Sequence, residues 1–216
     1  MALGHKKLKG NNGQIIKSFL ELSQRMKFDE KWTEAFLNSM LEDSKNGNYD
    51  SLLETEKYMY GSAEVVGLWM ARILNLPTDS YKYARLLGKY FQYINFIRDI
   101  DEDNYLKRKY IPRVFLDKHK LSSLKKEAVF MKKKQFEELI REEVQRSLTW
   151  REEALKGFQY IPYKYRIAIS TADKMYYWTA RKIYANPMIV FEKKVKPSKL
   201  RILTSGFLSM LYEIRF

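Results

Sequence analysis

Two amides and two carboxylates recur at helical spacing in the middle of the chain, at Gln92, Asn95, Asp99 and Asp103. On an α-helix, steps of three, four and four residues keep four side chains within a stripe about 80° wide. Carboxylates four residues apart repel each other on a bare helix, so a compensating cation is expected. Magnesium typically takes one or two protein carboxylates and completes its coordination with water and substrate phosphates. The stripe therefore predicts a site for Mg²⁺ and a phosphorylated ligand, with a solvated acidic helix end as the alternative.

The surroundings of the stripe favour the metal site over the solvated helix end. Phe91, Ile94 and Phe96 are apolar neighbours, which indicates a packed helix. The basic segment 104–134 follows with eleven Lys and Arg against two acidic residues, a net charge of +9. Acidic residues that can bind a metal, next to basic residues that can bind an anion, fit a metal–diphosphate site. Taken alone, the run 132–134 fits a solvated face or a contact with an anionic membrane better.

A second pattern lies upstream, where small residues recur every four positions at Ala63, Gly67 and Ala71. Such a stripe allows close helix–helix packing, or it lines a cavity and leaves room for an apolar ligand. Glu64 interrupts this apolar run and needs a partner or solvent.

Long helical periods must position these residues, and strand-like alternation is scarce. The sequence predicts an all-α fold in one domain, with segment 1–14 as an N-terminal tail or expression remnant and 15–216 as the domain. We expect Asp29 to cap the second helix. Thr78 and Asp79 are expected to cap a central helix. We expect helices over about 14–26, 30–43, 52–74, 80–103, 122–156, from 162 onward and from about 197 onward.

Composition excludes several classes of protein. The 216 residues contain no cysteine and only two histidines, His5 and His119, which excludes disulfide frameworks and argues against zinc sites and a Ser-His-Asp triad. No uncharged apolar run approaches the roughly 20 residues of a membrane span. The net charge of +14 permits nucleic-acid binding, but no such motif is found and no nucleic acid is expected.

The stretch from Gln92 to Pro112 resembles the second aspartate-rich motif of the squalene/phytoene synthase family, QxxNxxRDxxED followed by RxYIP. The segment 58–67 is similar to the substrate helix of that family, although Ser62 and Glu64 replace its commoner Val and Gly. Met40 and Asp43 match a further Met-x-x-Asp signature. Weaker similarity extends to about residue 203.

The resemblance implies an isoprenoid-synthase-type helical bundle around a central cavity, which joins two prenyl diphosphates head to head with Mg²⁺. It implies that Asp99 and Asp103 are metal ligands. It also implies that Asp99, Asp103 and Arg98 are the catalytic residues. Arg98 and Arg108 are expected near the diphosphate or in ion pairs that organise the acidic motif. The implied substrate-binding residues are Gln92, Asn95, Tyr58, Ala63, Val66, Gly67, Met70, Arg108, Tyr110 and Tyr176.

Some consequences of the resemblance stay open. Geranylgeranyl diphosphate to phytoene is favoured, and farnesyl diphosphate to squalene, with NADPH, is the alternative. No D-x-x-x-D precedes Asp99, so the chain is expected to lack the first acidic motif and first helices of the family, and to be inactive alone. A non-catalytic role in assembly or lipid binding is the competing function. We expect a cytoplasmic protein, with peripheral membrane contact through segment 104–134 as an option.

Overall fold

The computed structural model describes residues 11–44 and 47–213, and in these ranges the chain is helical with one isolated β-bridge. The predicted all-α class is confirmed. Eight longer helices build the body: α1 (Asn11–Met26), α2 (Glu30–Asp43), α3 (Leu52–Met59), α4 (Val65–Ile73), α5 (Tyr81–Arg98), α9 (Lys133–Leu155), α10 (Tyr163–Ala185) and α11 (Lys199–Glu213). Three short helices join them: α6 (Ile100–Tyr105), α7 (Arg113–Lys118) and α8 (Lys126–Met131).

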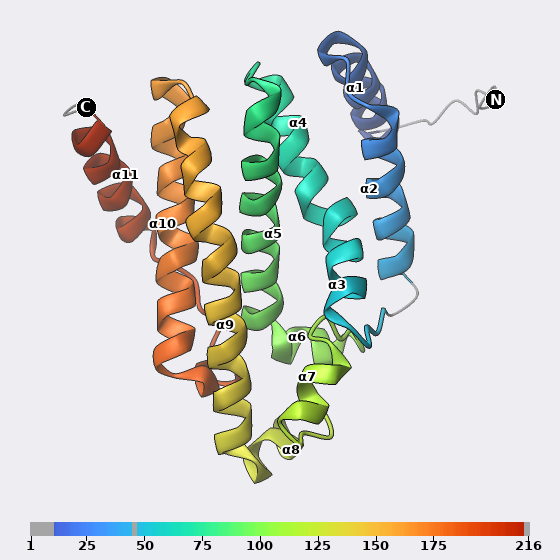
Figure 1. Cartoon of the computed structure of the whole chain (residues 1–216), viewed down its shortest axis with the longest axis vertical. Coiled ribbons are helices and arrows are strands. Elements are labelled where there is room, and N and C mark those ends of the chain that lie inside the picture. The colour runs from blue at the N-terminus through green and yellow to red at the C-terminus, as the bar shows by residue number, and fades with distance from the viewer. Residues whose placement is uncertain (1–10, 45–46, 214–216) are drawn as a thin grey trace.

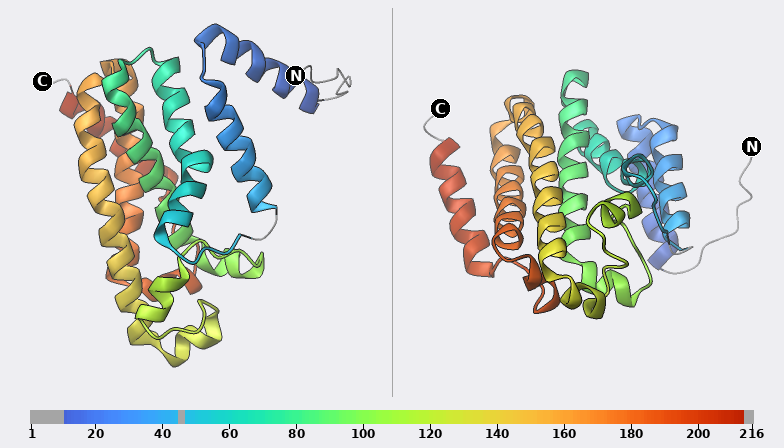
Figure 2. Two further views of the ribbon diagram at one scale, coloured as in Figure 1. Left: turned by 45° about the vertical axis from the view of Figure 1, so that its right-hand side comes forward. Right: turned by 60° about the horizontal axis from the view of Figure 1, so that its bottom comes forward.

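Helix α5 lies at the centre of the molecule, packed between α4 and α9 (Figure 1). Helix α10 packs on α5 and α9, and α11 packs on α10 at one outer edge. Helices α1 and α2 lie at the opposite edge, and α1 runs at an angle to α2 (Figure 2). Helices α6, α7 and α8 close the lower end. No helix in the described ranges is long and apolar enough to cross a membrane.

The N-terminal region agrees with the sequence in part. Helix α1 begins at Asn11, within the range 1–14, whereas the first ten residues, His5 among them, lie outside the described residues. The predicted cap at Asp29 is confirmed, because its side chain accepts a hydrogen bond from Lys31 N at 2.9 Å.

The helix expected over 52–74 contains a π-helical turn, η1 (Tyr60–Glu64), between α3 and α4. Gly61 packs closely here, since a Cβ on it would lie 2.2 Å from the carbonyl oxygen of Ala35 in α2. The turn also directs buried Glu64 toward α5, where Arg85 Nε donates to Glu64 Oε2 at 2.8 Å. Glu64 therefore has the partner that the sequence required.

Three predicted boundaries are wrong. Thr78 and Asp79 do not cap α5; they form a 3₁₀ turn, η2 (Thr78–Ser80), in which Ser80 Oγ donates to the carbonyl of Pro77 at 2.6 Å. The helix expected to run to 103 breaks at Asp99. The helix expected over 122–156 starts as α8 and is interrupted at Lys132, whose extended φ of −130° separates α8 from α9.

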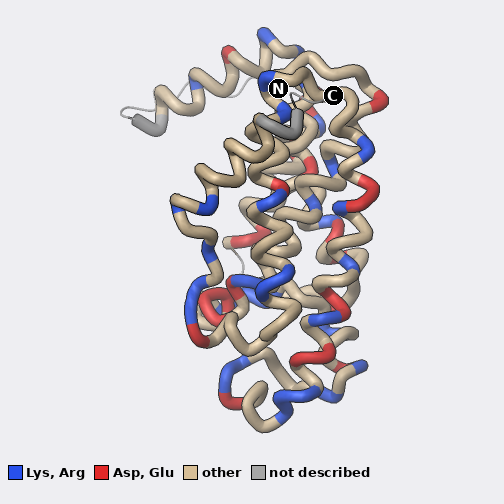
Figure 3. The backbone as a smooth tube through the Cα atoms, turned by 90° about the vertical axis from the view of Figure 1, so that its left-hand side faces the viewer, with Lys and Arg blue, Asp and Glu red and all other residues tan. Residues whose placement is uncertain are grey.

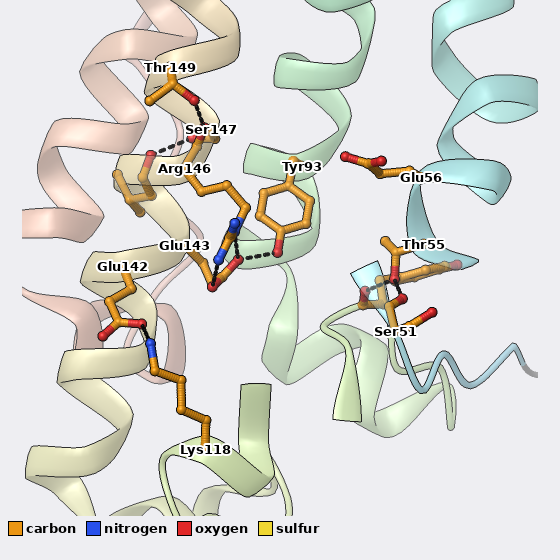
Figure 4. A network of polar contacts seen from close by, with 12 residues as sticks. Ser51, Thr55, Glu56, Tyr93, Lys118, Glu142, Glu143, Arg146, Ser147 and Thr149 are labelled. Atoms are coloured by element: carbon orange, nitrogen blue, oxygen red, sulfur yellow. Dashed lines mark hydrogen bonds and ion pairs between the residues drawn. The ribbon is translucent and has the colours of Figure 1, made fainter. Parts of the chain in front are cut away.

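The core between α5 and α9 encloses a buried polar network (Figure 4). Tyr93 and Glu143 are fully buried or nearly so, and Tyr93 Oη donates to Glu143 Oε2 at 2.5 Å. Arg146 Nε donates to the same carboxylate oxygen at 2.9 Å. The carboxylate is thus paired and hydrogen-bonded, as a buried charge requires. This network fixes α5, the helix that carries the acidic stripe, against α9.

Candidate active site

The polar stripe crosses the junction of α5 and α6 without losing its spacing. Asp99 N donates to the carbonyl of Asn95 at 2.9 Å, and Asp103 N donates to that of Asp99 at 2.8 Å, so both carboxylates keep the i to i+4 relationship. Asn95 Nδ2 donates to Gln92 Oε1 at 3.5 Å. The backbone spacing of the stripe is thus kept, although Asp99 and Asp103 line different hollows. Asp99 lines one with Glu102 and Lys194, and Asp103 lines a smaller one with Phe96 and Arg108.

The amide oxygen of Asn95 is buried and has no hydrogen-bond partner among the described residues. A buried acceptor without a partner costs free energy, so it indicates a place for a donor or a cation. Asp99 is one turn further along the same face.

Asp99 is held by cations from two sides. Arg98 grips both carboxylate oxygens, with Nε 2.9 Å from Oδ1 and Nη2 2.5 Å from Oδ2. Lys194, from the segment before α11, places Nζ 3.6 Å from Asp99 Oδ1 and also pairs with Glu102. These residues border a polar hollow of about 480 Å³. Of the two roles expected for Arg98, the structure has the ion pair that organises the motif.

Asp103 has a different electrostatic environment. Burial, and then the negative charge of Asp99, raise the pKa of Asp103 to about 7, although Arg108 opposes the shift. At neutral pH this carboxyl group therefore carries a proton part of the time. A cation bound beside it would replace that proton and restore the carboxylate.

Asp43 joins the site from α2, although it was expected only as part of a Met-x-x-Asp signature. The hydroxyl groups of Tyr58 and Tyr110 both donate to Asp43 Oδ1, the former at 3.0 Å. Arg108 Nη2 lies 3.5 Å from Asp43 Oδ2. Asp43 also contributes to the raised pKa of Asp103, which places its charge near the acidic stripe. The Met-x-x-Asp spacing was the signal that could have identified it.

An apolar cavity of about 210 Å³ lies beside the first half of α5. Ala63, Val66, Gly67 and Met70 form one wall of it. The α5 wall comprises Tyr83, Ala84, Leu87, Gly88 and Phe91, and further walls include Gly157, Phe158, Ile169 and Ala172.

Six of the ten predicted substrate residues lie outside the set that lines this cavity: Gln92, Asn95, Arg108, Tyr110, Tyr58 and Tyr176. Tyr58 belongs to the Asp43 cluster. Tyr176 of α10 stacks on the lining residue Phe91, with ring centroids 4.1 Å apart.

The small residues serve packing as well as the cavity. A Cβ on Gly67 would lie 2.2 Å from the carbonyl oxygen of Ala84, and one on Gly88 would lie 2.5 Å from that of Ala63. The backbones of helices α4 and α5 thus approach each other closely. The small-residue stripe therefore serves both close helix packing and the wall of the cavity.

The basic segment 104–134 forms the lower loops around α7 and α8, where Lys and Arg positions appear in blue (Figure 3). Within it, Lys118 Nζ pairs with Glu142 of α9 at 2.6 Å, and Arg108 contacts Asp43. Only part of this segment therefore borders the acidic stripe.

Comparisons with known proteins agree with this geometry. A family model described as squalene/phytoene synthase matches residues 2–201. A 15-cis-phytoene synthase of Pantoea ananas is 30% identical over 135 residues, which cover 62% of this chain and 43% of the relative. One from Enterobacter agglomerans is 29% identical over 168 residues, covering 76% and 57%. The chain thus spans about half the length of the curated relatives it matches.

Solved structures show the same fold. A dehydrosqualene synthase bound to a ligand superposes with a TM-score of 0.76 at 20% identity, covering 88% of this chain and 67% of the other. A squalene synthase from Alicyclobacillus acidocaldarius superposes with a TM-score of 0.69 at 18% identity, covering 76% and 62%. The predicted isoprenoid-synthase-type bundle is confirmed. With a family model matched over nearly its whole length, the chain belongs to the squalene/phytoene synthase family.

Proposed function

We propose that this chain carries the second-motif half of an enzyme that condenses two prenyl diphosphates head to head. Geranylgeranyl diphosphate is the favoured substrate, with phytoene as the product, because the curated relatives are named phytoene synthases. Farnesyl diphosphate, leading to squalene with NADPH as reductant, is the second candidate.

One observation carries the proposal: α5 joins an apolar cavity to a polar, acidic stripe. Its first half lines the cavity as far as Phe91, and its second half bears the stripe from Gln92 onward. Phe91 and Asp99 are eight residues apart, or about 12 Å along a helix. A prenyl diphosphate has the same polarity, with an apolar chain on one side of a diphosphate head.

The donor set fits Mg²⁺ bound together with a diphosphate. Two carboxylates, Asp99 and Asp103, and the free amide oxygen of Asn95 supply oxygen ligands. The described residues hold no group of three or more His, Cys, Asp or Glu suited to a metal, so the protein alone is a weak site and substrate oxygens complete it. When bound, Mg²⁺ supplies positive charge to the leaving diphosphate.

The protein side chains then have distinct tasks. Gln92 and Asn95 orient diphosphate oxygens or metal-bound water, and Arg98 orients Asp99. Arg108 and Tyr110 organise Asp43 and, through it, the charge near Asp103. These are positioning roles that keep the acidic stripe arranged before the substrate arrives.

The cavity wall holds the prenyl chain and excludes water. Ala63 and Gly67 bring α4 close to α5, while Val66 and Met70 remain 40% and 46% exposed, so the wall is open on that side. In the proposed reaction the donor loses diphosphate, and its allylic cation adds to the acceptor double bond. Loss of a proton from the adduct closes a cyclopropyl intermediate that still carries the diphosphate of the acceptor. This intermediate loses that diphosphate as it rearranges, and the resulting cation loses a second proton to give phytoene or accepts hydride from NADPH to give squalene. Such a cation must be kept from water.

A non-catalytic role in assembly or lipid binding is the second candidate, and it is favoured by the single D-x-x-x-D in these 216 residues. The test is incubation with Mg²⁺ and geranylgeranyl or farnesyl diphosphate, followed by extraction and analysis of hydrocarbons. We expect turnover that is lower by orders of magnitude than that of full-length relatives. Product that disappears in Asp103→Asn supports catalysis. Analogue binding without any product supports the second candidate, and absence of both binding and product contradicts both.

A further inference from the structure

We propose that α11 docks on an anionic lipid bilayer through its outward face. The helix is turned opposite to the usual arrangement, with small residues inward and large apolar residues outward. On the packed side, Ser209 Oγ accepts a hydrogen bond from Lys174 Nζ of α10 at 2.7 Å. Gly206 also lies on this side, where an added Cβ would be 3.7 Å from Thr171 Oγ1.

The outward face is almost wholly apolar over three turns. Leu200, Leu203 and Phe207 follow at steps of three and four and are 71%, 72% and 57% exposed. Leu208 flanks them and is 61% exposed, and Thr204 is the polar residue between them. A continuous apolar surface of this kind marks an interaction site, because isolated exposed apolar residues are the norm.

Charge identifies the kind of partner. Residues 193–201 contain five cations, at Lys193, Lys194, Lys196, Lys199 and Arg201, and no acidic residue occurs from 193 to 212. Among the described residues, no ion pair engages Lys193, Lys196 or Lys199. Lys194 is engaged by Asp99 and Glu102, so Lys193, Lys196 and Lys199 are the cations left for a partner. An apolar helical face that follows such lysines is the pattern of helices that lie in the interface of anionic membranes.

A bilayer explains the surface better than a second copy of the chain does. Each copy carries a net charge of +14 and the same basic cluster, so self-association through this face brings like charges together. An anionic bilayer offers the opposite charge and an apolar layer at once.

The position of α11 is suited to such contact. It lies at the outer edge of the molecule beside α10 (Figure 1). Ile169 and Ala172 of α10 line the apolar cavity, whereas Thr171 between them is next to Gly206 of α11. Docking would therefore bring a wall of the cavity within one helix of the bilayer.

The basic segment 104–134 is the competing contact, since Phe130 and Met131 are exposed next to the lysine run 132–134. Its exposed large apolar residues are spread in and next to three short helices, α6, α7 and α8, whereas α11 presents its apolar side chains along three turns of one helix. They are Tyr105, Leu106, Val114, Phe130 and Met131. The experiment therefore includes variants of both surfaces.

Vesicle flotation tests the proposal with the full 216-residue chain. We expect the protein to float with phosphatidylcholine vesicles that contain phosphatidylglycerol and to remain behind with pure phosphatidylcholine. The double variant Leu203→Gln/Phe207→Gln should lower partitioning by about tenfold or more, since it removes two large apolar side chains from the contact. The matched control Leu41→Gln/Leu53→Gln, with two exposed leucines at the other edge, should float like the wild type. Circular dichroism should show all variants equally helical, because the changed side chains are exposed.

Three results would overturn the proposal. One is equal flotation of the α11 variant and the wild type. Another is loss of flotation only when Lys132, Lys133 and Lys134 are changed to Glu, which would assign the contact to segment 104–134. The third is a lipid-free dimer in sedimentation velocity that Leu203→Gln/Phe207→Gln dissociates, which would assign the face to a second copy. None of these measurements uses a prenyl diphosphate, so their failure leaves the proposed function standing.

Discussion

Tyr58 donates its hydroxyl group to Asp43 Oδ1 at 3.0 Å, which ties the end of α2 to α3 beside the acidic stripe. Tyr110 donates to the same oxygen, and both tyrosines are buried. Burial, reinforced by the charge of Asp43, raises the pKa of Tyr58 to about 12, so it remains a donor at any pH near neutrality. The carboxylate of Asp43 thus connects α2, α3 and the loop that contains Tyr110.

Asp43→Ala should destabilise the protein by about 1–3 kcal/mol, because it leaves two buried hydroxyl groups without their acceptor. Urea unfolding followed by tryptophan fluorescence measures the change. Glu34→Ala is the matched control on α2, since Glu34 is exposed, and it should remain within about 0.5 kcal/mol of the wild type. An Asp43→Ala variant as stable as this control would show that the cluster does not hold α2 in place.

The raised pKa of Asp103 predicts a pH dependence of stability. The pKa of Asp103 is about 7 in the folded state, whereas the unfolded chain releases the proton near the ordinary value of 3.8. The folded state therefore binds more protons between these values, and the free energy of unfolding contributed by Asp103 falls as pH rises from about 4 to 7. Asp103→Asn should remove this part of the slope. Urea unfolding of the wild type and of Asp103→Asn between pH 4 and 7 tests this prediction. If the free energy of unfolding changes with pH equally in both proteins, the raised pKa of Asp103 is contradicted.

Gly67 predicts a packing effect that can be separated from helix propensity. Gly67→Ala should destabilise by about 1–3 kcal/mol, because its Cβ meets the backbone carbonyl of Ala84. Gly206→Ala is the matched control in another helix, where a Cβ makes ordinary contact, and it should stabilise by about 0.5–1 kcal/mol. The two changes in urea midpoint should have opposite sign. Equal effects would mean that the α4–α5 contact is looser than described.

The sequence predicted the site best where it depends on local spacing. The steps from Gln92 to Asp103 survive the break at Asp99 because the i to i+4 backbone hydrogen bonds continue through it. The π-helical turn was not predictable, since it depends on Gly61 meeting the backbone of Ala35 in another helix.

Long-range contacts account for the other omissions. Asp43 and Tyr110 are 67 residues apart, so their contact has no local signature. Lys194 reaches Asp99 from the other end of the chain, across the hollow beside α6. Short helices such as α7 contain too few residues for a periodic pattern.

The central claim is that Asp99 and Asp103 bind a prenyl diphosphate through Mg²⁺, and calorimetry with a non-reactive thiodiphosphate analogue tests it most directly. We predict binding of the analogue in Mg²⁺, none in EDTA, and no detectable binding of Mg²⁺ alone, because two carboxylates are a weak site for this cation. Asp103→Asn should abolish the Mg²⁺-dependent part, and Asp101→Asn, an exposed neighbour, should retain it. Binding that is equally strong in EDTA, or unchanged in Asp103→Asn, would contradict the account.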